Sequence, residues 1–150
     1  MNRIAIASIA AVLLLVTSAL AADPAAKGAP KGGVTPQQIT RGKYLVERVG
    51  LCIDCHSPRD QKGQYVPGQT LQGAPLGFKN TVPMPKWAEV APPIAGLPGW
   101  TAEQGITFLM TGKEPNGETP DPPMPEYRMN REDATAVVAY LKSLQPSGTK

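Results

Sequence analysis

Three stretches of the chain carry apolar residues at the spacing of an amphipathic helix. The first begins after Thr35, where an N-cap threonine, a proline at the first helical position and a glutamine at the third predict a helix start. Gly50 can end this helix. Its apolar stripe contains a glycine, which is unfavourable in a helix and so indicates close approach by another helix. The expected apolar face is Ile39, Gly42, Val46 and Val49.

The second and third amphipathic stretches lie in the C-terminal third of the chain. Thr101 and Gln104 repeat the capping-box pattern, and Gly112 closes the helix that they begin. Asn130 can cap a third helix, which Pro146 stops. The expected apolar faces are Ala102, Ile106, Leu109 and Met110 for the second helix, and Ala134, Val137, Val138, Leu141 and Leu144 for the third.

Between these helices, residues 57–99 contain many prolines and glycines and show neither helical nor strand periodicity. The whole chain has 17 Pro and 15 Gly, but only two Phe and two Trp to fill a core. So much irregular backbone is reasonable if it lies along a large apolar cofactor. The net charge of +3 is too small to indicate nucleic acid or anionic lipid as a partner.

The candidate chemistry is concentrated in Cys52-Ile53-Asp54-Cys55-His56, directly after the first helix. Two thiols three residues apart, followed by an imidazole, are typical of covalent haem attachment, with Cys52 and Cys55 as thioethers and His56 on the iron. The chain has no other cysteine or histidine, so a zinc site lacks its second pair of ligands. A thioredoxin-like dithiol shares the cysteine spacing, but the strand pattern of its βαβ setting is missing.

A low-spin haem needs a second axial ligand, and methionine is the main candidate. Met110 and Met129 are explained by packing, the first on a helix face and the second beside the Asn130 cap. Met84 and Met124 each lie between two prolines, which limit the freedom of the backbone and so favour presentation of a thioether. Met124 is preferred because its loop leads into the last helix, and Met84 remains the alternative.

The N-terminus resembles a secretory signal. Arg3 precedes an uncharged run that ends in Ala19-Leu20-Ala21, the small residues that a signal peptidase recognises. We therefore expect a signal peptide at 1–21, a flexible leader at 22–34, the folded domain at 35–145 and a tail at 146–150. This places the protein in the periplasm, where bacteria attach haem to this motif. An uncleaved anchor in the inner membrane is the alternative, and membrane contact is expected only in that case.

Together these residues resemble a single-haem class I cytochrome c, similar to the cytochrome subunits of bacterial periplasmic dehydrogenases. The resemblance covers roughly 35–144 and includes the haem motif, Pro123-Met124-Pro125 and the ending Tyr140-Leu141-Lys142. It implies an all-α fold of three or more helices with long Pro/Gly-rich loops around one covalent haem c. The first and last helices would cross, with Gly42 meeting Tyr140, and His56 and Met124 would be the axial ligands.

The function implied is electron transfer rather than enzymatic catalysis. The expected partners are redox proteins, namely a periplasmic dehydrogenase as donor and a terminal oxidase or another cytochrome as acceptor. The alternative is a haem enzyme or gas sensor with an open axial position. Such a protein would need a distal acid or base, and the chain has no second histidine to supply one.

Overall fold

The computed structural model describes residues 33–144 and 146. The predicted signal peptide and nearly all of the predicted leader and tail therefore lie outside the described residues. The helices are α1 (Pro36–Tyr44), the π-helical continuation η1 (Leu45–Val49), α2 (Cys52–His56), α3 (Ala102–Thr111) and α4 (Arg131–Ser143). Two short strands, β1 (Ala74–Pro75) and β2 (Val90–Ala91), complete the fold. The all-α prediction is confirmed.

The helix ends follow the capping signals in the sequence. Thr35 and Thr101 each form a complete capping box at the start of α1 and α3, and the Asn130 side chain accepts a hydrogen bond from the Asp133 amide at the start of α4. Gly112 ends α3 in the left-handed conformation, at φ 69°. All three helix starts were thus predicted correctly, because capping depends on residues only three positions apart.

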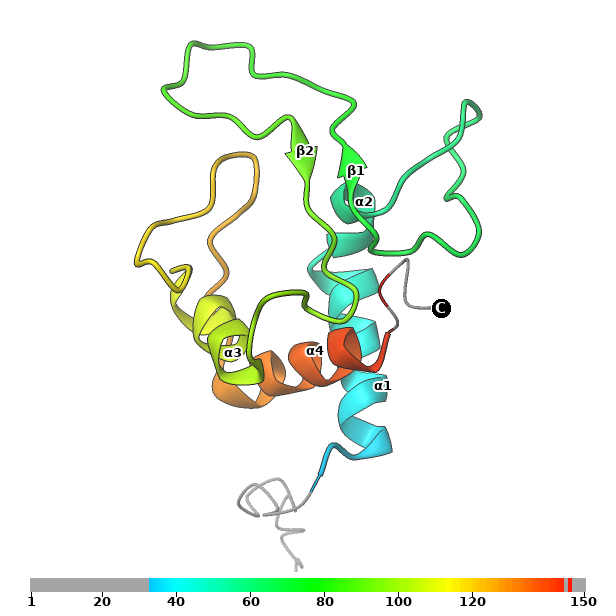
Figure 1. Cartoon of the computed structure of the whole chain (residues 1–150), viewed down its shortest axis with the longest axis vertical. Helices are drawn as coiled ribbons and strands as arrows, with labels where there is room; N and C mark the ends of the chain where they lie inside the picture. The colour runs from blue at the N-terminus through cyan, green and yellow to red at the C-terminus, as the bar shows by residue number, and fades with distance from the viewer. Residues whose placement is uncertain (1–32, 145, 147–150) are drawn as a thin grey trace, which may run out of the picture. The chain divides into compact units, whose positions relative to one another are not determined.

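Helix α4 crosses α1 (Figure 1). Gly42 of α1 lies where the two helices meet. A β-carbon placed on Gly42 would lie 1.9 Å from the Ala136 carbonyl oxygen and 2.7 Å from the Tyr140 β-carbon. The two helices therefore approach more closely than any side chain at position 42 allows. The predicted contact between Gly42 and Tyr140 is confirmed.

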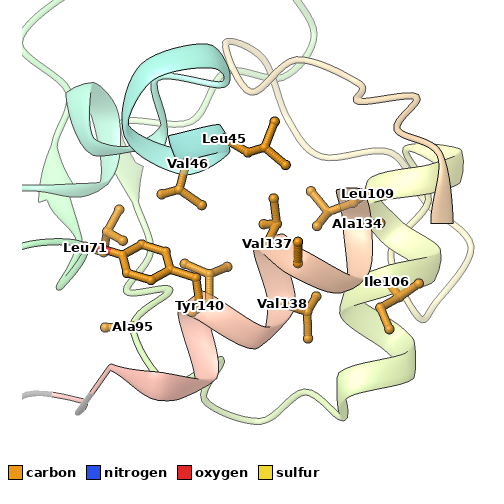
Figure 2. Close-up of a cluster of buried hydrophobic side chains, with 12 residues drawn as sticks. Leu45, Val46, Leu71, Ala95, Ile106, Leu109, Ala134, Val137, Val138 and Tyr140 are labelled. Atoms are coloured by element: carbon orange, nitrogen blue, oxygen red, sulfur yellow. The ribbon is translucent and has the colours of Figure 1, made fainter. Parts of the chain in front are cut away.

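The hydrophobic core lies between α4, the α1–η1 segment and α3 (Figure 2). Helix α4 contributes the largest share of it, since every residue from Ala136 to Leu141 is buried. The Pro/Gly-rich segment also contributes, because Leu71 is fully buried in the same cluster as Tyr140 (Figure 2). The segment at 57–99 therefore contributes to the hydrophobic core, in addition to any contact it makes with a cofactor. Its strands pair antiparallel, with Ala74 opposite Ala91, and residues 76–89 form the loop between them.

Two predicted face positions are wrong. Val49 is 55% exposed, because the chain from Leu45 to Val49 is π-helical and the Gly50 amide bonds to the Leu45 carbonyl. The wider turn rotates Val49 away from the face that Val46 occupies. Ala102 is exposed as well, since it begins the first turn of α3 on the solvent side. Among the described residues, no helix is long and apolar enough to cross a membrane.

Candidate haem-attachment site

Both cysteines lie on the single helical turn α2, which starts directly after η1. Leu51 reverses the chain before it in the left-handed conformation, at φ 50°. Cys52 and Cys55 are both free thiols and both partly buried. Residues three apart on a helix share a face, so the two sulfur atoms lie on one side of the turn. This is the arrangement that attachment to one porphyrin edge requires.

His56 closes the same turn and is buried, with 5% of its surface exposed. Its Nδ1 lies 2.7 Å from the Pro92 carbonyl oxygen, which can only accept a hydrogen bond. Nδ1 therefore carries the proton, and the lone pair is on Nε2, where it can bind a metal. Burial lowers the pKa of His56, which keeps the imidazole in the neutral, coordinating form. The hydrogen bond to Pro92 thus sets both the orientation and the tautomer of the His56 ring.

The surroundings of Cys52 argue against a thiol redox site. The motif follows a helix and not a strand, so the βαβ setting of thioredoxin-like modules is not present around it. Burial raises the pKa of the Cys52 thiol, whereas reactive cysteines have lowered pKa values. The Tyr127 hydroxyl, which reaches this turn from a distant loop, donates a 2.6 Å hydrogen bond to the Gly50 carbonyl.

The loops that carry the two Pro-Met-Pro segments are in contact. The Ala88 amide donates to the Pro122 carbonyl at 2.7 Å, and Lys86 approaches Asp121 at 3.9 Å. This contact joins the 76–89 loop to the loop that precedes α4. Met124 is partly buried, whereas Met84 is 39% exposed. The other two methionines, Met110 and Met129, pack against the core as predicted.

Sequence reasoning missed two residues that hold the haem-binding turn, Pro92 and Tyr127. No pattern in the neighbouring sequence identifies either residue. The partner of Pro92 is His56, 36 positions away, and the partner of Tyr127 is Gly50, 77 positions away. The aromatic residues do pair, although no specific role had been predicted for them. The rings of Phe78 and Trp87 pack edge to face, with their centroids 6.1 Å apart. The rings of Trp100 and Phe108 do the same, with their centroids 5.3 Å apart.

The family profile of cytochrome c matches residues 39–145. The chain belongs to the cytochrome c family. Its fold is therefore the all-α class I fold that the resemblance implied, and membership implies a covalently bound haem c. The residues present fit that group: two thiols on one face of a turn, and an adjacent imidazole whose Nδ1 proton is donated to a carbonyl.

Several curated proteins are similar to the chain. A diheme cytochrome c-type protein of Cereibacter sphaeroides is 30% identical over 118 residues, which cover 75% of the chain. The cytochrome c subunit of a quinone alcohol dehydrogenase from Gluconacetobacter polyoxogenes is 32% identical over 129 residues, or 78% of the chain. A fructose dehydrogenase cytochrome subunit from Gluconobacter japonicus is 28% identical over 69% of it. The chain spans only 37%, 26% and 21% of these relatives.

Proposed function

We propose that this cytochrome carries electrons in the periplasm through one haem c, held by Cys52 and Cys55 and ligated by His56 and Met124. The haem supplies an iron that cycles between ferric and ferrous states. The chain contains one attachment motif and two cysteines, which supports a single haem. The observation that carries the proposal is the 2.7 Å contact between His56 Nδ1 and the Pro92 carbonyl, because it presents Nε2 as a ligand.

Met124 is the proposed second axial ligand, with Met84 as the alternative. A methionine that binds the iron must keep its sulfur out of water. Of the two candidate methionines, Met124 is the more buried. The Met124 amide also bonds to the Asp121 carbonyl at 3.2 Å, which fixes the turn that carries the thioether. A thioether ligand favours ferrous iron and so raises the reduction potential, which suits an acceptor of electrons from respiratory donors.

The proposed electron donor is a periplasmic dehydrogenase, and the proposed acceptor is a terminal oxidase or another cytochrome. Support for the donor comes from relatives that are cytochrome subunits of alcohol and fructose dehydrogenases. Support for export comes from residues 1–21, which have the composition of a cleavable signal peptide. An inner-membrane anchor facing the periplasm is the alternative if this segment is retained.

The test is the spectrum of the ferrous protein, matured in a bacterial periplasm, before and after brief exposure to carbon monoxide. A closed iron with two protein ligands should keep its low-spin spectrum. Met124→Ala should then bind carbon monoxide promptly, whereas Met84→Ala should behave like the wild type. The reverse result would assign the ligand to Met84. Prompt binding by the wild type would mean an open axial position, and would favour the gas-sensor or haem-enzyme alternative over electron carriage.

A further inference from the structure

Tyr127 connects two parts of the site that are far apart in the sequence. It lies three residues after Met124 in the loop that leads into α4, and its ring is partly buried against the core. Its hydroxyl donates a 2.6 Å hydrogen bond to the carbonyl oxygen of Gly50, 77 positions earlier. Gly50 ends η1 and stands two residues before Cys52. The bond therefore spans from the methionine loop to the base of the attachment turn.

The same hydroxyl lies beside the first attachment sulfur. A β-carbon placed on Gly50 would be 3.4 Å from Cys52 Sγ and 3.4 Å from the Tyr127 hydroxyl oxygen. Addition of the Cys52 S–H across a haem vinyl group would form a bond from sulfur to carbon and move the thiol hydrogen to the other vinyl carbon. The hydrogen bond from Tyr127 to Gly50 uses the phenol hydrogen and a backbone carbonyl, so thioether formation takes neither of its partners.

We propose that Tyr127 is a positioning residue that holds the methionine loop against the attachment turn and so keeps the sixth ligand on the iron. The inference rests on the proposed function, specifically on Met124 as ligand. A neutral thioether binds iron weakly, so its retention depends on how little its loop can move away. Groups that orient a ligand through hydrogen bonds commonly change metal binding severalfold or more when they are removed. Tyr127 is placed to act in this way without touching the iron.

Tyr127→Phe removes the hydroxyl and keeps the ring, and Tyr140→Phe is its matched control. The Tyr140 hydroxyl donates a 2.7 Å hydrogen bond to Glu47 Oε1 on η1, so this bond involves no residue of the methionine loop. Both variants lose one hydroxyl from a buried or partly buried ring. A purely structural role for Tyr127 would therefore give the two variants similar losses of stability and no difference at the iron.

The measurements are made on the haem-loaded protein: the rate of carbon monoxide binding to the ferrous form, the thioether-to-iron charge-transfer band of the ferric form, and the urea midpoint of unfolding. We expect Tyr127→Phe to bind carbon monoxide roughly three- to tenfold faster than the wild type, as the loss of one net hydrogen bond implies. Its charge-transfer band should weaken. Tyr140→Phe should keep the wild-type rate and band while its urea midpoint falls.

A wild-type rate and band in Tyr127→Phe would overturn the positioning role, whatever happens to its urea midpoint. Equal acceleration in both tyrosine variants would also overturn it, because the effect would then follow global stability. Failure of the underlying ligand assignment looks different. In that case the wild type itself binds carbon monoxide promptly, or Met124→Ala leaves its spectrum unchanged.

Discussion

Replacing Gly42 with alanine tests the helix crossing on which the fold depends. The new β-carbon would lie 1.9 Å from the Ala136 carbonyl oxygen, and ordinary contact begins at 3.4 Å. The obstruction is backbone, and the Tyr140 β-carbon at 2.7 Å is fixed to backbone as well. No change of rotamer can relieve such a clash. Helices α1 and α4 must therefore move by about 1.5 Å relative to each other, the difference between 3.4 and 1.9 Å.

Two opposing effects set the size of the change. Alanine is favoured over glycine within a helix by about 0.5–1 kcal/mol. Overpacking of a core costs about 1–3 kcal/mol and more when backbone must shift. Here the shift also disturbs the core cluster that contains Val46 and Val137, which are 0% and 1% exposed. We expect a net loss of about 2 kcal/mol in the free energy of unfolding, and a melting temperature lower by about 8–16 °C.

The assay is urea unfolding of the haem-loaded protein, followed by circular dichroism. Gly105→Ala in α3 is the control, because its β-carbon would meet only the ends of the Val138 and Leu97 side chains, at 3.0 and 3.2 Å. Those ends can move, so we expect the control to stay within about 1 kcal/mol of the wild type. The reasoning is refuted if Gly42→Ala is also that stable, because the helices would then separate at little cost.

Two further perturbations address pH and the long loop. Burial and the hydrogen bond to Glu47 raise the pKa of Tyr140 above its usual 10.0, so the unfolded chain loses this proton first as pH rises. The free energy of unfolding should therefore fall above about pH 10, by at most about 1.4 kcal/mol per pH unit for this group, and Tyr140→Phe should fall less steeply in urea titrations at several pH values. An identical slope would contradict this. Replacing residues 76–89 with Asn-Gly should join β1 to β2 as a hairpin, because Pro75 and Val90 are already paired. The ferrous spectrum should stay low-spin without Met84, and carbon monoxide binding at once would show that the excised loop carried the ligand.

Sequence reasoning succeeded where a residue acts on its near neighbours. The capping threonines 35 and 101 bond to amides three positions away, so their effect is readable from a few letters. Gly42 was also informative, because a glycine inside an apolar helical stripe has few explanations other than close packing. These signals predicted where the three long helices begin and that another helix packs closely against Gly42. That this helix is the last one was implied by the resemblance to class I cytochromes c.

The same reasoning could not supply the partners of the haem-binding turn. The Pro92 carbonyl is a backbone group, and every residue has one, so the sequence does not mark it as the acceptor for His56. The exposure of Val49 was missed for a related reason. The π-helical turn depends on how the chain enters α2, and a regular period of 3.6 residues does not describe it.

Hydrogen bonds hold both ends of the long segment between His56 and Pro92. The segment can therefore be long without disturbing the turn that carries the two cysteines. The Gly73 amide donates to the His56 carbonyl at 2.8 Å, and the Leu71 amide donates to Ser57 Oγ at 2.8 Å. The chain then returns through the Ile94 amide, which bonds to the Leu71 carbonyl at 2.9 Å. Additional residues between these hydrogen bonds cost little loop-closure entropy, since that cost grows only with the logarithm of loop length. Changes between β1 and β2 should therefore alter the surface of the loop, whereas changes near Pro92 should alter the orientation of the His56 ring.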